Sequence, residues 1–169
     1  MANRHGVFFS PSISLRPEAP IVGLWSCMKG EWMSALKKIL YVDDEPDIRE
    51  IAVMSLQLNS EFEVRSARGG AEAIAMAQAW QPDIVLLDVM MPEMDGPMTR
   101  QNLAANGATR SIPVAFVTAR TRPAEVARFL SMNVVGVIAK PFDPMTLAQE
   151  VADLLKAIDQ VEVPVDRPR

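Results

Sequence analysis

From residue 37 onwards, short apolar runs alternate with segments in which apolar residues recur every three or four positions. The runs are typical of buried β-strands and cover residues 39–42, 62–67, 84–87, 114–117 and 134–139. The helical spacing predicts helices over residues 46–58 and 71–80, from residue 97 to about 106, and over 122–132 and 144–157. Strand and helix therefore alternate five times. This order predicts an α/β fold, a parallel sheet with helices on both faces, because right-handed crossovers connect such strands.

The first residues of the chain follow neither period. We predict that residues 1–36 are an N-terminal extension, either a disordered tail or sequence read from a start codon placed too early. The alternative is a docking tail anchored by Trp25 and Trp32. A secretory signal is not expected, because the apolar run of residues 7–9 is short and a proline follows soon after it. The domain itself is predicted over residues 37–157, followed by a short polar tail over 158–169.

Composition and charge narrow the class of protein. Apolar residues make up 49% and charged residues 22% of the 169 positions, as in an ordinary globular protein and unlike a disordered one. The net charge of −4 does not favour a nucleic-acid-binding domain. No apolar run approaches the roughly 18 residues of a membrane span. With Cys27 and His5 as the single cysteine and histidine, we expect a cytoplasmic protein without an internal disulfide or a histidine metal cluster.

Polar residues stand where the predicted strands end. The first strand runs into Asp43 and Asp44, the third into Asp88, the fourth into Thr118 and the fifth into Lys140. In open α/β sheets, ligands bind outside the carboxyl ends of the strands. These three carboxylates, one hydroxyl and one ammonium group are therefore predicted to meet at one edge of the sheet.

The predicted cluster has a specific chemistry. Carboxylates that repel one another favour a hard divalent cation such as Mg²⁺, which takes oxygen ligands. An ionised aspartate in the centre, Asp88, could then form an aspartyl-phosphate. Lys140 and Thr118 would bind the remaining phosphoryl oxygens.

Each of these residues also has an ordinary structural interpretation. Asp43 and Asp44 could be helix-capping acids, and Lys140 could be a surface lysine. Thr118 could be a hydroxyl that bonds within its own turn. These interpretations do not explain why all of the residues stand at strand ends, so we favour the phosphoryl site.

The strand-end motifs resemble those of a known family. They are Asp43-Asp44, Asp88 with Met91-Pro92 and Asp95-Gly96 behind it, Thr118-Ala119 and Lys140-Pro141-Phe142. In this order they resemble the receiver domain of two-component response regulators, over residues 37–157. The resemblance implies a five-stranded, doubly wound, flavodoxin-like sheet of strand order 2-1-3-4-5.

The resemblance also implies the role of each group. Asp88 is then the phosphoacceptor, which takes a phosphoryl group from a histidine of a sensor kinase or phosphotransfer protein. Mg²⁺ is held by Asp44, Asp88 and the backbone carbonyl of Met90, with Asp43 bound through water or completing the acidic pocket.

The resemblance likewise assigns Thr118 and Lys140 to the phosphoryl group, with Ala119 and Pro141 in support. It further implies a cis peptide before Pro141. Lys140 would then be aimed at the site from the end of the fifth strand.

The chain departs from the family pattern at two positions. Val137 stands where many receivers have an aromatic residue that switches with the hydroxyl of Thr118. Pro97 directly follows Asp95-Gly96, so we expect a shifted start of the next helix. We further hypothesise that Met90 and Arg120 tune the phosphoryl lifetime, Met90 by excluding water and Arg120 by attracting charged groups.

Few residues follow the predicted domain, so we predict a stand-alone response regulator or phosphorelay intermediate that is not a turnover enzyme. It would signal through the face of the fourth helix, fifth strand and fifth helix, with Arg122 and Arg128 as contact candidates. The alternatives are a pseudo-receiver that works without phosphorylation and a truncated transcription factor. A haloacid-dehalogenase-like phosphatase is a further alternative, but it needs an acid two residues after the nucleophile, where Met90 stands. Partners that are nucleic acids or membranes are not expected.

Overall fold

The computed structural model of the chain describes residues 36–161. The predicted extension over residues 1–36, with Trp25 and Trp32, lies outside this range except for Leu36. The predicted tail over 158–169 lies outside it from residue 162 onwards, and residues 158–161 belong to the last helix and not to a tail. In the part that is described, no helix is long and apolar enough to cross a membrane.

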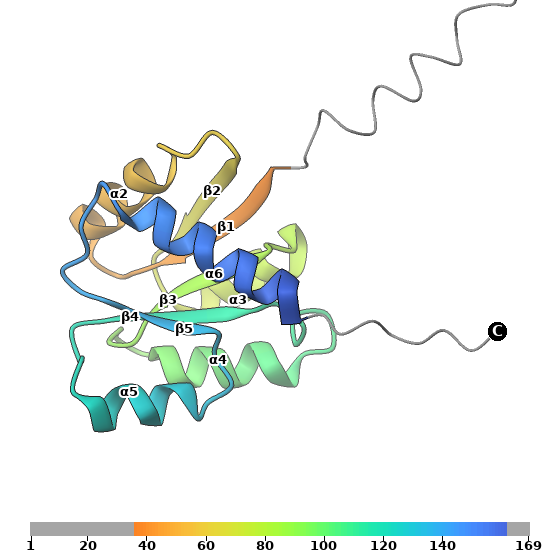
Figure 1. The fold of residues 1–169 in the computed structure, drawn as a ribbon. Coiled ribbons are helices and arrows are strands. Elements are labelled where there is room, and N and C mark those ends of the chain that lie inside the picture. The colour runs from red at the N-terminus through yellow and green to blue at the C-terminus, as the bar shows by residue number, and fades with distance from the viewer. Residues whose placement is uncertain (1–35, 162–169) are drawn as a thin grey trace, which may run out of the picture. The chain divides into compact units, whose positions relative to one another are not determined.

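Five parallel strands form one sheet in the order β2-β1-β3-β4-β5 (Figure 1). The strands are β1 (Lys37–Val42), β2 (Phe62–Ala67), β3 (Ile84–Asp88), β4 (Val114–Thr118) and β5 (Gly136–Ala139). The predicted doubly wound, flavodoxin-like order is therefore confirmed. Each strand is followed by a helix, namely α2 (Pro46–Leu56), α3 (Gly70–Trp80), α4 (Gly96–Ala105), α5 (Pro123–Leu130) and α6 (Leu147–Val161).

The helices cover both faces of the sheet and create two apolar cores (Figure 1). Neighbouring residues of β1 contribute to different cores, because successive side chains of a strand point to opposite faces. Ile39 and Tyr41 pack with residues of α2 and α6, whereas Leu40 and Val42 pack with residues of α3, α4 and α5. Strands β3 and β4 are buried along their whole length, which explains their continuous apolar sequence.

The start of α4 differs from the prediction. The helix begins at Gly96, so Pro97 lies in its first turn and does not delay it. The carboxylate of Asp95 caps the helix by accepting the N–H of Met98 at 2.8 Å. Gly96 is needed there because a Cβ atom would lie 2.5 Å from the carbonyl oxygen of Asp88. This contact sets the N-terminus of α4 directly against the end of β3.

Two further boundaries were predicted too early. Helix α6 begins at Leu147 and not at residue 144, because Asp143 organises a turn before it. The side chain of Asp143 accepts the N–H of Met145 at 2.9 Å, and its carbonyl accepts that of Leu147 at 3.0 Å. Strand β5 begins at Gly136 and not at residue 134, because Asn133 has a left-handed φ of 56° and ends the turn after α5.

Candidate functional site

The parallel sheet brings the predicted strand-end residues to one edge. Asp88 and Thr118 are the last residues of β3 and β4, and Asp43 and Lys140 directly follow β1 and β5. The ladders keep these ends in register, since Val42 pairs with Leu87 and Thr118 pairs with Ala139. The site therefore draws on four adjacent strands.

Three carboxylates form the acidic part of the site. Carboxylate oxygens of Asp43, Asp44 and Asp88 all lie within 4.8 Å of one another. Asp43 is fully buried, Asp88 is 4% exposed, and Asp44 is half-buried. Clustered carboxylate oxygens are the donors that a hard divalent cation takes, so these residues fit the Mg²⁺ site that the sequence predicts.

Lys140 bridges two of these carboxylates. Its Nζ lies 2.7 Å from Oδ2 of Asp43 and 3.2 Å from Oδ1 of Asp88. The side chain of Lys140 is only 13% exposed, so water screens neither contact strongly. The backbone N–H of Lys140 donates to the carbonyl of Thr118 at 2.8 Å, and the peptide between Lys140 and Pro141 is cis, as predicted.

Burial and neighbouring charges shift the pKa values of Asp88 and Lys140. Burial raises the pKa of Asp88 above its ordinary 3.8, although the ammonium group of Lys140 opposes this shift. Burial alone would lower the pKa of Lys140, but the hydrogen bond from Lys140 to Asp43 and the charge of Asp88 raise it. Lys140 is therefore a firmly protonated cation beside a carboxylate that is costly to ionise.

Thr118 is buried at the end of β4, and its hydroxyl oxygen accepts the backbone N–H of Arg120 at 3.0 Å. This is the bond within its own turn that the sequence left open. A hydroxyl that accepts one hydrogen bond still has its own proton to donate. The contact fixes the oxygen without using up the donor that a phosphoryl group would need.

The residues predicted to tune the site lie at its rim. The Met90 side chain is 57% exposed two residues after Asp88, whereas that of Met91 is buried in the core. The guanidinium group of Arg120 lies 3.9 Å from the carboxylate of Glu125 in the first turn of α5. Val137, at the position of the expected aromatic switch, packs partly buried against the α3-α4-α5 core.

Two residues that hold Asp43, Tyr41 and Arg49, were not predicted from the sequence. The hydroxyl of Tyr41 donates to Oδ2 of Asp43 at 3.1 Å, and a guanidinium N–H of Arg49 donates to the Asp43 backbone carbonyl at 2.7 Å. Strand periodicity could have indicated the first contact, because residues two apart in a strand share one face. No sequence signal pointed to Arg49.

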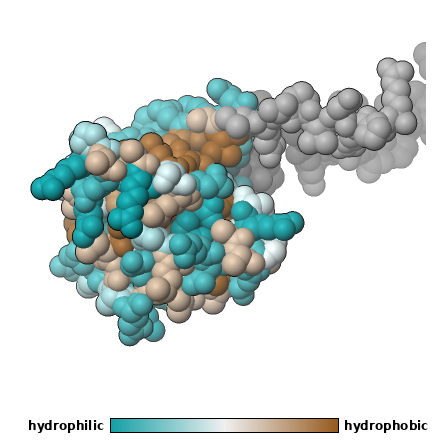
Figure 2. Space-filling view, turned by 90° about the horizontal axis from the view of Figure 1, so that it is seen from below, coloured by the Kyte–Doolittle hydropathy of each residue, from teal (hydrophilic) through white to brown (hydrophobic). Residues whose placement is uncertain are grey.

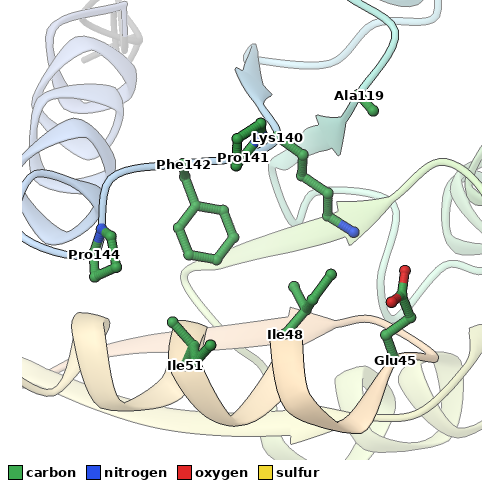
Figure 3. Close-up of a pocket in the computed structure, with 8 residues that line it drawn as sticks. All are labelled: Glu45, Ile48, Ile51, Ala119, Lys140, Pro141, Phe142 and Pro144. Atoms are coloured by element: carbon green, nitrogen blue, oxygen red, sulfur yellow. The ribbon is translucent and has the colours of Figure 1, made fainter.

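An apolar pocket of about 400 Å³ adjoins the site (Figure 3). Its walls come from the N-terminal half of α2 and from the loop between β5 and α6. Figure 3 shows the ring of Phe142 facing Ile48 and Ile51, with Lys140 and Ala119 farther along the pocket. Nζ of Lys140 connects the pocket to the site, since it contacts the carboxylates of Asp43 and Asp88. Ala119 and Pro141, the predicted supporting residues, thus line a wall of this pocket.

Comparison with known proteins identifies the family and the fold. The profile of the response regulator receiver domain family matches residues 39–152. The chain is 35% identical over 117 residues to response regulator Rre1 of Synechocystis, covering 69% of this chain and 51% of that protein. It is 37% identical over 121 residues to response regulator PleD of Caulobacter vibrioides, covering 70% of this chain and 26% of PleD. The chain spans about half the length, or less, of these relatives.

Solved structures share the fold. The chemotaxis protein CheY4 of Vibrio cholerae superposes with a TM-score of 0.65 at 31% identity, over 71% of this chain and 99% of CheY4. A receiver protein domain from Methanoculleus marisnigri gives a TM-score of 0.59 at 33% identity, over 79% of this chain and all of that domain.

Proposed function

Because this chain belongs to the response regulator receiver domain family, we propose that it is a phosphorylation switch with Asp88 as the phosphoacceptor. One observation carries the proposal. The buried ammonium group of Lys140 bridges Asp43 and Asp88 beside a cluster of three carboxylates. A site built only for stability would not bury two acids around one lysine, since each buried ion loses its hydration.

The proposed reaction is a phosphoryl transfer from a phosphohistidine. An oxygen of the Asp88 carboxylate forms a bond to phosphorus, the phosphorus–nitrogen bond breaks, and its electron pair stays on the imidazole, which takes up a proton. Lys140 pairs with one phosphoryl oxygen and the hydroxyl of Thr118 donates to another.

Asp43, Asp44 and Asp88, with the backbone carbonyl of Met90, would hold the metal of this reaction. Bound Mg²⁺ would supply positive charge against the phosphoryl oxygens. The three clustered carboxylates support this assignment, because an approaching phosphoryl dianion would otherwise be repelled by them.

We further propose that the protein acts by binding partners rather than by turnover. The donor would be a sensor histidine kinase or phosphotransfer protein of the cytoplasm. Met90 occupies the position where phosphatases of the haloacid-dehalogenase type carry a general acid, which argues against phosphomonoester hydrolysis.

We propose the face of α5, β5 and α6 as the output surface. A shallow pocket there is lined by residues of β5 and α6, including Val137, Glu150 and Leu154. Arg122 and Arg128 are exposed at the two ends of α5. Figure 2, viewed from the side on which α4 and α5 lie in Figure 1, shows hydrophilic residues interspersed with hydrophobic ones and one more strongly hydrophobic patch. Such a mixed surface suits a reversible contact.

The proposal is tested by labelling the protein with acetyl phosphate and Mg²⁺ and mapping phosphate that is stable in acid and labile in base. Label on Asp88 that requires Mg²⁺ and disappears in Asp88→Asn is the expected result. Asp83→Asn, an exposed acid just before the same strand, should label normally as the matched control. Absence of label from this donor and from phosphorylated histidine kinases would contradict the switch and favour a pseudo-receiver. Turnover of a generic phosphomonoester would instead indicate a phosphatase.

A further inference from the structure

Tyr41 is a buried polar group to which the phosphotransfer chemistry assigns no role. It is the only tyrosine of the chain, and it is fully buried in the middle layer of the fold, within β1. Its hydroxyl donates to Oδ2 of Asp43 at 3.1 Å. A buried tyrosine hydroxyl usually forms a hydrogen bond, and the partner of this one is the carboxylate of Asp43.

Three donors converge on the Asp43 carboxylate. Oδ1 accepts the backbone N–H of Glu45 at 3.0 Å. Oδ2 accepts two donors at once, the hydroxyl of Tyr41 at 3.1 Å and Nζ of Lys140 at 2.7 Å. Asp43 is completely buried, so water cannot replace a donor that leaves.

The ring of Tyr41 packs against the loop that carries Lys140, the partner of Asp43. It packs edge to face on Phe142, with ring centroids 6.4 Å apart. Phe142 stands two residues after Lys140, in the loop that leaves β5. Tyr41 therefore contacts Asp43 through its hydroxyl and the lysine-bearing loop through its ring.

We propose that Tyr41 is a positioning residue that lets Lys140 move from Asp43 to the phosphoryl group. The inference rests on the proposed function, in which Lys140 binds a phosphoryl oxygen. When the ammonium group shifts towards that oxygen, Oδ2 of Asp43 keeps the hydroxyl of Tyr41 as its donor. Without this hydroxyl, the shift would leave Oδ2 of the buried Asp43 carboxylate without a hydrogen-bond donor from the protein, which is a costly state.

The test uses Mg²⁺ and beryllofluoride, an analogue of the aspartyl-phosphate, in titration calorimetry. In Tyr41→Phe we expect beryllofluoride affinity to fall about fivefold or more, while affinity for Mg²⁺ alone changes less than twofold. A general disturbance of the site would change both. Phe142→Leu, which removes the ring contact and keeps the hydroxyl, should change beryllofluoride affinity less than Tyr41→Phe does.

A second measurement uses the unaltered protein and does not depend on how the variant folds. Because the chain has one tyrosine, tyrosine labelled with ¹³C at the Cζ atom gives a single NMR signal. Beryllofluoride should shift this signal, since the hydroxyl becomes the only side-chain donor to Oδ2. An unmoved signal, or unchanged beryllofluoride affinity in Tyr41→Phe, overturns the role of Tyr41 and leaves the proposed function intact. Failure of the unaltered protein to bind beryllofluoride with Mg²⁺ overturns both.

Discussion

The two ends of the sheet hold the same residue types in opposite environments. At the amino end, Lys37 of β1 lies 3.5 Å from Asp159 of α6, and their side chains are 38% and 65% exposed. At the carboxyl end, Lys140 lies 2.7 Å from Asp43, and their side chains are 13% and 0% exposed. The pairs share their chemistry and differ in their access to water.

This difference decides what each pair can do. An exposed ion pair contributes about 0–1 kcal/mol, because water competes with each partner. Water does not compete for the partners of a buried pair. Removing one partner therefore leaves the other as an unpaired buried charge, at a cost of about 3–5 kcal/mol. Substitution of a charged residue at the amino end should therefore have little effect on stability. At the carboxyl end, charged groups are held away from water in an unfavourable arrangement, which a bound cation or phosphoryl group can change.

The largest expected effect is that of Lys140→Met. We expect the free energy of unfolding to fall by about 3 kcal/mol at pH 7 without Mg²⁺, because Asp43 and Asp88 stay buried without their cation. Urea denaturation followed by circular dichroism measures the change. Added Mg²⁺ should restore part of the loss if the three acids bind it. A loss below about 1 kcal/mol would show that the two ends of the sheet differ less than their burial suggests.

A smaller effect of opposite sign is expected for Asp88→Asn. Burial raises the pKa of Asp88, so the folded state holds this proton more tightly than the unfolded chain, and ionisation of Asp88 destabilises the fold. The variant should therefore be more stable than the unaltered protein at pH 7 without Mg²⁺. The difference should shrink as the pH falls through the raised pKa and vanish below the ordinary value of 3.8. Denaturation at several pH values measures this. A variant less stable at pH 7 would contradict the sign.

The fold was largely predictable because a polar residue marks the end of four of the five strands. The run before Asp88 is apolar throughout, and the acid marks where the buried ladder stops. The errors arose where side chains decide a boundary. Asp143 accepts the N–H of Met145 and delays α6, and Asn133 takes a left-handed conformation before β5. Such capping choices compete closely in free energy, so apolar periodicity does not determine them.

The site was predictable as a set of residues but not as a set of contacts. Sheet topology places Asp43, Asp88 and Lys140 at one edge, whatever their rotamers. The bond between Tyr41 and Asp43 needs a particular ring orientation within the core, which Phe142 helps to set. Packing of this kind depends on side chains from distant parts of the chain.

Substitutions at the rim should act on kinetics rather than stability. Met90 is 57% exposed beside the phosphoacceptor, so Met90→Asn should replace an apolar shield with an amide that can bind water. We expect the aspartyl-phosphate to hydrolyse about threefold faster, which corresponds to about 0.6 kcal/mol of barrier.

Arg120→Ala should alter the same hydrolysis rate. Arg110→Ala, which changes an exposed arginine before β4, should not. Loss of phosphate from labelled protein, followed over time, measures the rate. Unchanged hydrolysis in both rim variants would contradict the hypothesis.

The smallest effect is expected at the amino end, where Lys37→Met provides the direct counterpart of Lys140→Met. The substitution breaks the pair with Asp159, but both side chains are substantially exposed, so the aspartate simply regains water. We expect the free energy of unfolding to change by less than about 0.5 kcal/mol, and labelling of Asp88 to stay normal. The same urea denaturation measures it. A loss comparable to that of Lys140→Met would mean that burial does not separate the two ends. Unchanged stability of Lys37→Met, together with a large loss for Lys140→Met, would show that the unfavourable buried charge lies at the carboxyl edge of the sheet.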